Sequence, residues 1–294
     1  MKTIFDQLAK AILTAALRDV AQLESNREIR GHVLEADLWV EPDENRDSVL
    51  SALGMLGRMV ALGPCLIEPF SGVPKEHELR SCILKQYSLA HAQRRDAKTK
   101  RTPASPFPRL WVIAAGSPDA AIEAMELRSM QDWSSMSLEG AVLCGRPFDR
   151  FYLVVVRKLP RTPETVFLRL LSRGTTFREA IYDLAQVPES TPELAVVAER
   201  IMHVLVVFGK ELPQDDLEEN DMEALRDIEA AYSDWERRVK AEAKRETLVR
   251  ICNHFQIKLT EDRMAQIANC STQQLDDLLV EISATREWPD KNIE

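Results

Sequence analysis

The stretch V-L-E-A-D-L-W-V-E (Val33–Glu41) is followed, after a predicted helix, by C-L-I-E-P-F (Cys65–Phe70). Both pieces have the short apolar pattern of β-strands, and each carries carboxylates among apolar neighbours. Alternate side chains of a strand point to opposite faces, which places Glu68 and Phe70 on one face. A carboxylate in such surroundings costs several kcal/mol unless it is hydrogen-bonded, paired or bound to a metal. Asp37 and Glu68 are therefore the first candidate site residues.

Metal binding is one chemistry that suits this pair of carboxylates. Two carboxylates at adjacent strand ends can hold Mg²⁺, with water and a phosphate oxygen completing its octahedron. Such an ion activates water and stabilises the leaving oxygen of a phosphodiester. The alternative is that Asp37 and Glu68 lie at strand ends, where they are capped or solvated. The order of the elements favours the metal site: a helix, the Asp strand, the Glu strand, and a helix that carries Lys-Gln-Tyr.

That order resembles the PD-(D/E)xK nuclease superfamily, and within it the recombination-promoting or transposase-associated branch. The stretches that carry the resemblance are F-D-Q-L-A-K (Phe5–Lys10), E-A-D-L-W-V-E (Glu35–Glu41), C-L-I-E-P-F (Cys65–Phe70), and L-P-R-T-P-E-T-V-F-L-R-L-L-S-R-G (Leu159–Gly174) with E-A-I-Y-D-L (Glu179–Leu184). Each motif is short, and their common order over most of the chain is the evidence. The resemblance implies a Mg²⁺-dependent DNA endonuclease, with Mn²⁺ as an alternative ion and Asp37 and Glu68 as the metal ligands.

The chain departs from the family pattern at the third motif, where Glu68-Pro69-Phe70 replaces Glu-x-Lys. The phenylalanine stands where the family lysine would reach the scissile phosphate. Some relatives of this fold carry the lysine on the following helix, which here assigns the catalytic charge to Lys85 and the orientation of the site to Gln86 and Tyr87. Such an enzyme would have weakened activity. The alternative is a catalytically inactive nuclease-fold protein that acts as an interaction scaffold.

A basic block follows the Glu strand. Residues 80–109 contain eight cations and one acid, in a chain of formal net charge −9. Such a block in an acidic chain predicts a phosphate-bearing partner, and we expect weak, non-specific DNA binding. The expected DNA contacts are Arg94, Arg95, Lys98, Lys100 and Arg101. The alternative is a solvated loop that its charge keeps in solution.

The first helix and strand are predicted from apolar spacing. An amphipathic helix is expected over Thr3–Leu23 and a first strand over Arg27–Val33. Asp6 and Lys10 lie four residues apart on this helix, and we expect a surface ion pair worth a few tenths of a kcal/mol.

Further elements are expected along the first half of the chain. Asp43–Leu62 is predicted to be one helix inserted between the Asp and Glu strands, and Pro74–Ala97 to be the helix that carries the basic residues. Arg109–Ala115 is a continuous apolar run and is predicted to be a buried strand. Gly140–Cys144 and Phe151–Val156 are expected to be two later strands.

These elements predict an α/β fold, a restriction-endonuclease-like mixed sheet flanked by helices and followed by an all-helical C-terminal region. The expected divisions are a nuclease core at 1–160, a helical extension at 161–212, and a C-terminal helical region at 213–294 with a long charged helix over Met222–Cys252. A DNA-reading helix-turn-helix near the end is rejected, because Thr260–Glu294 carries eight acids against three bases. These last helices are expected to pack or to contact a protein partner or a second copy.

Composition restricts the compartment. No apolar run approaches the length of a transmembrane helix, and the opening M-K-T-I-F-D-Q-L lacks the apolar core of a signal peptide. The five cysteines are odd in number and scattered, with no C-x-x-C, which favours reduced thiols over a disulfide frame or a zinc site. We therefore expect a cytoplasmic protein without a membrane segment.

Overall fold

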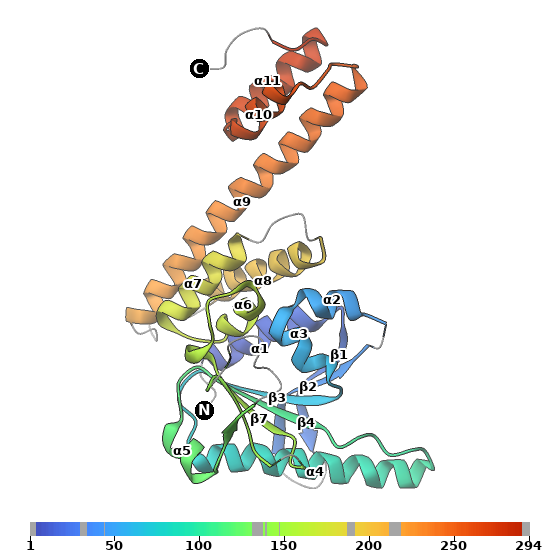
Figure 1. The fold of residues 1–294 in the computed structure, drawn as a ribbon, viewed down its shortest axis with the longest axis vertical. Helices are drawn as coiled ribbons and strands as arrows, with labels where there is room; N and C mark the ends of the chain where they lie inside the picture. Colours follow the sequence, from blue (N-terminus) through green and yellow to red (C-terminus); the bar gives the residue numbers. More distant parts are fainter. Residues whose placement is uncertain are drawn as a thin grey trace. The chain divides into compact units, whose positions relative to one another are not determined.

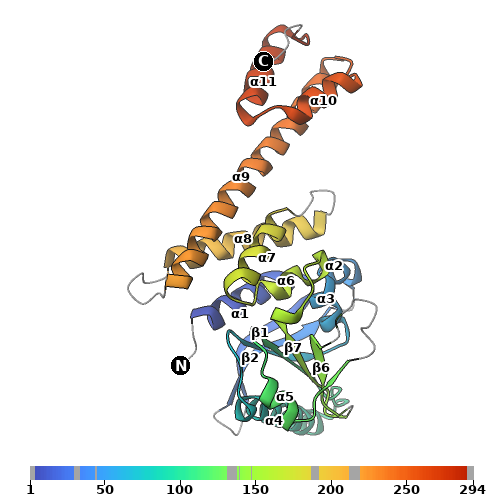
Figure 2. The same ribbon diagram turned by 60° about the vertical axis from the view of Figure 1, so that its left-hand side comes forward.

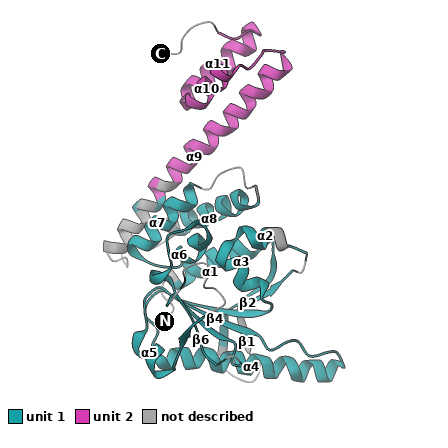
Figure 3. Ribbon diagram, viewed as in Figure 1, with its two compact units in different colours: residues 1–228 teal, residues 229–294 magenta. Residues whose placement is uncertain are grey.

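The computed structural model describes residues 4–29, 34–43, 45–130, 138, 140–146, 148–186, 192–211 and 219–289. The chain divides into two compact units, Met1–Ile228 and Glu229–Glu294 (Figure 3). Unit 1 contains the predicted nuclease core and the helical extension that follows it. Each unit is described separately below.

Unit 1 is built on one mixed sheet, which has seven strands in the described part of the chain and the order β1-β2-β3-β4-β7-β6-β5. Its strands are β1 (Ala21–Ile29), β2 (Leu34–Pro42), β3 (Cys65–Phe70), β4 (Arg109–Ala114), β5 (Arg128–Ser129), β6 (Val142–Cys144) and β7 (Phe151–Val155). β1, β2 and β3 pair antiparallel, whereas β3, β4 and β7 pair parallel. β6 and β5 continue the sheet antiparallel.

Helices cover both faces of this sheet (Figures 1 and 2). The long α4 runs along one face with α5, and α1, α3, α6, α7 and α8 lie on the other side. The helices are α1 (Ile4–Leu17), α2 (Asp47–Ala52), α3 (Gly54–Ala61), α4 (Glu76–Lys100), α5 (Asp119–Ala124), α6 (Val166–Arg169), α7 (Gly174–Ala185), α8 (Pro192–Glu211) and α9 (Glu219–His254). This arrangement confirms the predicted α/β fold with a mixed sheet flanked by helices.

The two central strands owe their place to composition. Residues 65–69 of β3 and 110–114 of β4 are buried, as expected for apolar runs in parallel strands that are covered on both faces. Below α4, side chains from β3, β4 and β7 form one apolar cluster with Leu79, Cys82 and Leu89 of the helix. The cluster fixes α4 against the sheet and so determines which of its residues approach β3.

Several predicted elements have other limits in the structure. α1 ends at Leu17 and β1 begins at Ala21, so the predicted limits of the first helix and strand were wrong. The predicted strand began too late because the first residues of β1 are polar, as suits an edge strand. The rest of the predicted strand, residues 30–33, lies outside the described part of the chain. The single helix expected over 43–62 is two helices, because Gly54, the first residue of α3, adopts a left-handed φ of +57°. α4 extends beyond the expected end to Lys100 and is capped by Arg101 at a φ of 54°.

Unit 2 contains the later part of α9 with α10 (Glu261–Asn269) and α11 (Thr272–Thr285), which confirms the predicted helical C-terminal region. The hydroxyls of Thr260 and Ser271 accept hydrogen bonds from the first turns of α10 and α11 and cap them. The three helices enclose a small apolar core of Leu248, Cys252, Ile267, Leu275, Leu278 and Ile282. Among the described residues of both units, every helix is too short or too polar to cross a membrane.

Candidate functional site

Asp37 and Glu68 stand opposite each other on neighbouring strands. The antiparallel register pairs Leu38 with Ile67, and its next step brings Asp37 beside Glu68. The backbone N–H of Asp37 donates to Oε1 of Glu68 at 3.2 Å. Asp37 is 8% exposed and Glu68 only 1% exposed. The two carboxylates that the sequence singled out therefore form one buried pair.

Two lysines contact this pair, one from each of two helices. Lys85 of α4 places its Nζ 2.7 Å from Oε2 of Glu68, which brings together the three predicted catalytic residues. Lys10 of α1 places its Nζ 2.6 Å from Oδ1 of Asp37 and donates to Oδ1 of Asn26 at 2.8 Å. The site thus holds two carboxylates and two ammonium groups.

Lys10 and Asp6 differ from the expected surface pair. Lys10 is 9% exposed, and its ammonium lies between β1 and β2, so the expectation of a surface role was wrong. Asp6 accepts a hydrogen bond from the backbone N–H of Ser71, directly after β3, at 3.1 Å. The first helix motif therefore contacts the end of the Glu strand and the Asp strand together.

The environment perturbs both members of the Glu68–Lys85 pair. Burial, and after it the nearby charge of Asp37, raises the pKa of Glu68 from 4.5 to about 7, although Lys85 partly opposes the rise. Burial alone would lower the pKa of Lys85, but the charge and hydrogen bond of Glu68 hold it above its usual value. Lys85 is therefore an ammonium at neutral pH. Such perturbed groups concentrate at functional sites.

Phe70 stands where the family pattern has a lysine. Its ring is partly buried and packs against the apolar cluster below α4. An ammonium at this position would lose that packing and would need a partner among apolar side chains. The ammonium that contacts Glu68 comes instead from Lys85 of α4.

Gln86 and Tyr87 turn away from the carboxylate pair. Gln86 is fully buried, and its Nε2 donates to the carbonyl oxygens of Pro108 and Asp149, both at 2.9 Å. Tyr87 is exposed, donates its hydroxyl to Oδ1 of Asp149 at 2.9 Å, and packs edge-on against Phe107. These contacts fix α4 to the starts of β4 and β7, and lend no support to the predicted orienting role.

The five predicted DNA contacts are exposed and lie at the end of α4 that projects past the sheet (Figure 1). At 1.5 Å per residue, Arg95 lies about 15 Å along the helix from Lys85. At about 100° per residue, Lys100 is turned by about 60° from Lys85 around the helix and Arg95 by about 80° the other way, whereas Arg94 and Lys98 face roughly the opposite side. The basic residues therefore surround the helix end and do not form one flat face.

The donor set fits a magnesium ion in part. Asp37 and Glu68 supply two carboxylates, and Mg²⁺ in phosphate-processing sites is often held by one or two carboxylates with waters and phosphate oxygens. Among the described residues, no group of three or more His, Cys, Asp or Glu side chains is placed so that it could hold a metal ion. An ion here would therefore depend on the substrate for much of its coordination.

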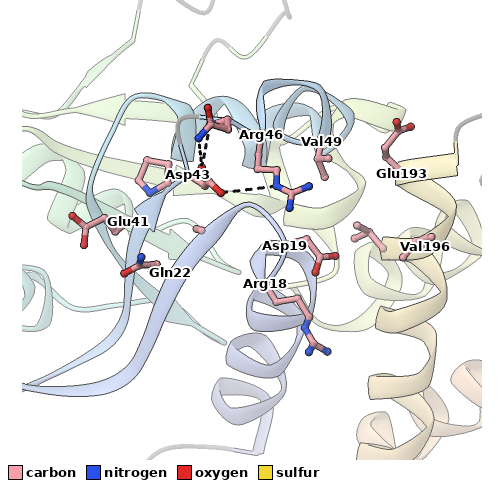
Figure 4. Close-up of a pocket in the computed structure, with 13 residues that line it drawn as sticks. Arg18, Asp19, Gln22, Glu41, Asp43, Arg46, Val49, Glu193 and Val196 are labelled. Atoms are coloured by element: carbon pink, nitrogen blue, oxygen red, sulfur yellow. Dashed lines mark hydrogen bonds and ion pairs between the residues drawn. The ribbon is translucent and has the colours of Figure 1, made fainter.

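A separate hollow of about 1040 Å³ lies where α1 ends, β1 begins and β2 ends (Figure 4). Its lining includes two cations, Arg18 and Arg46, and acids such as Asp19, Glu41 and Glu193. None of the predicted site residues lines it. Its mixed charges indicate no particular class of ligand.

Comparisons with protein-family models, curated proteins and solved structures find no match to this chain. Sequence reasoning missed Lys10 and Asn26 as site residues. Lys10 lies inside the first-helix motif, which was a usable signal. Asn26 lies in a polar edge strand, and nothing in the local pattern marked it.

Proposed function

We propose that this protein is a metal-dependent phosphodiesterase that acts on DNA, an endonuclease of the PD-(D/E)xK type. One observation carries the proposal: Asp37, Glu68 and Lys85 come from three separate elements and converge on one place in the fold. The strand order of β1 to β4, with α4 as the crossover between β3 and β4, supports it. Mg²⁺ is the proposed ion, and Mn²⁺ is the alternative.

Each residue has a distinct task in this proposal. Asp37 and Glu68 would hold the ion, which supplies an activated water and stabilises the leaving oxygen. Lys85 is charged at neutral pH and is held by Glu68 at 2.7 Å. A preorganised ammonium in a site shielded from water stabilises negative charge that develops on a phosphate oxygen. The packing of α4 on the sheet sets the position of that ammonium.

The exposed cations at the end of α4 would hold the DNA backbone. On duplex DNA, log affinity falls by roughly 0.9 per phosphate contact for each unit of log salt. Replacing Lys98, Lys100 and Arg101 together by alanine should therefore flatten the salt dependence of binding. Filter binding over a salt series measures this slope, and an unchanged slope would place the DNA contacts elsewhere.

Plasmid cleavage with Mg²⁺, with Mn²⁺ and with EDTA tests the catalytic proposal. Lys85→Met should slow cleavage by a few hundred-fold, the effect of losing about 3–4 kcal/mol of transition-state stabilisation. Arg80→Met is the matched control, because it removes an exposed charge from the same helix and is not among the proposed DNA contacts. Cleavage that persists in EDTA, or that survives Lys85→Met in a folded variant, would contradict the proposal.

The second candidate is a non-catalytic interaction scaffold, and one observation favours it. Phe70 fills the place of the motif lysine with apolar packing, and two lysines already balance the charge of both carboxylates. A scaffold would show neither cleavage with either ion nor DNA binding at low salt. The same two assays therefore separate the candidates.

A further inference from the structure

Lys10 occupies a built site between three elements. Its Nζ lies 2.6 Å from Oδ1 of Asp37 on β2 and 2.8 Å from Oδ1 of Asn26 on β1. The residue is nearly as buried as Asp37 itself. Holding a lysine side chain in one position costs side-chain entropy, and the contacts with Asp37 and Asn26 must offset that cost.

Asn26 adopts an unusual backbone to take part. Its φ is +52° in the middle of β1, a left-handed conformation that non-glycine residues adopt rarely and asparagine more readily than most. The flanking pairs are Ser25 with Leu38 and Arg27 with Ala36, so Asn26 stands opposite Asp37. Strained backbone of this kind concentrates at functional sites. Here it coincides with the residue that holds the Lys10 ammonium.

The Lys10 ammonium and a divalent ion would compete for the same carboxylate, that of Asp37. The ammonium groups of Lys10 and Lys85 balance the carboxylates of Asp37 and Glu68. A magnesium ion binds a carboxylate oxygen at about 2.0–2.1 Å, so an ion on Oδ1 of Asp37 would lie within a few ångströms of the Lys10 ammonium, which is 2.6 Å from that oxygen. An ion on Oδ2 of Asp37 would still lie within a few ångströms of the Lys10 ammonium, and two like charges this close repel each other strongly in a buried site.

We propose that Lys10 is a built-in cation that competes with the divalent ion for Asp37, so that the ion binds only when the Lys10 ammonium moves away. This inference rests on the proposed function, because it assigns a regulation to the same metal site. Lys10 acts on the ion through Asp37 and is a positioning residue. Asn26 holds Lys10 in the competing position.

Direct metal binding tests the inference without any need for cleavage. The affinity of the full chain for Mn²⁺ is measured by calorimetry and by the loss of the free-ion electron paramagnetic resonance signal. Lys10→Met keeps the length of the side chain and removes its charge, and should tighten Mn²⁺ binding at least tenfold. Asn26→Gly suits the positive φ and removes only the amide, and should tighten binding several-fold. Arg80→Met, which removes an exposed charge on α4, should leave the affinity unchanged.

The outcomes separate this inference from the proposed function. If Asp37→Asn abolishes Mn²⁺ binding but Lys10→Met and Asn26→Gly bind as the wild type does, or more weakly, the competition is refuted and the metal site stands. If folded wild type, Lys10→Met and Asn26→Gly all fail to bind Mn²⁺, the metal site itself is refuted, and the competition with it. Should Lys10→Met fail to fold, Asn26→Gly still decides.

Discussion

Glu68 should make the stability of unit 1 depend on pH. Its pKa is about 7 in the folded protein, because burial and then the charge of Asp37 raise it from 4.5. As pH rises, the unfolded chain loses this proton first, so the folded state binds more protons between these two values. The stability contributed by Glu68 is therefore complete below pH 4.5 and is lost as pH rises towards 7.

The size of this effect follows from the two pKa values. The interval from 4.5 to about 7 corresponds to about 3 kcal/mol, at 1.36 kcal/mol per pH unit. Glu68→Gln keeps the size and hydrogen-bonding capacity of the side chain and removes its titration. Near pH 5 the variant and the wild type should differ little in free energy of unfolding. At pH 8 the variant should be more stable than the wild type by roughly 2–3 kcal/mol.

Urea unfolding at pH 5, 6, 7 and 8, followed by tryptophan fluorescence, measures the difference. Ile67→Val is the control, because it removes a methyl group from the same strand and no titrating group. It should cost about 1 kcal/mol at every pH. Parallel stability curves for Glu68→Gln and the wild type would show that Glu68 is charged in the fold throughout, and the reasoning would fail.

Two further predictions concern buried polar contacts of unit 1, and urea unfolding checks both. Gln86→Leu leaves buried main-chain carbonyls without their donor and should lower the free energy of unfolding by about 2–3 kcal/mol. Tyr87→Phe, on the exposed side of α4, should lower it by less than about 1 kcal/mol. Equal losses for the two variants would contradict this assignment. Asp183→Asn leaves the buried guanidinium of Arg169 without its carboxylate and should cost about 3 kcal/mol, against less than about 1 for the exposed Arg161→Gln. Burial opposes the ionisation of Asp183, but hydrogen bonds from Arg161 and Arg169 lower its pKa overall. The stability that the Asp183 carboxylate contributes is therefore present above pH 3.8 and is lost as pH falls below that value. A penalty for Asp183→Asn that persists at pH 2 would refute the linkage.

The parts of the fold that the sequence predicted are those with a strong local pattern. Cys65–Phe70 and Arg109–Ala114 are mostly apolar, with one charged residue each, and both are buried central strands. The start of β1 was missed because A-Q-L-E-S-N-R-E-I has few apolar residues, as suits an edge strand that needs only one partner. The break at Gly54 was missed because a glycine inside a helical pattern reads equally well as a tolerated residue or as a stop.

Of the charged residues at the candidate site, the sequence predicted both carboxylates and one of the two lysines, Lys85. Asp37 and Glu68 were found because a carboxylate in an apolar strand is costly, a fact that needs no knowledge of tertiary structure. Lys85 was reached through the family resemblance, and its contact with Glu68 depends on how α4 packs across the sheet. No local pattern reports such a contact, because a lysine side chain can reach partners on other elements.

Lys10 shows the limit of local reasoning most clearly. Its spacing from Asp6 is that of a helix-surface pair, and an exposed pair of that kind contributes little to stability. In the fold Lys10 is buried beside Asp37, and breaking a buried pair by removing one partner is far more costly. The same five-residue segment thus changes from a minor surface feature into part of the site once the packing of α1 on the sheet is known. Under the proposed function, the decisive question at this site is which cation Asp37 binds, the ammonium of its own chain or a divalent ion from solution.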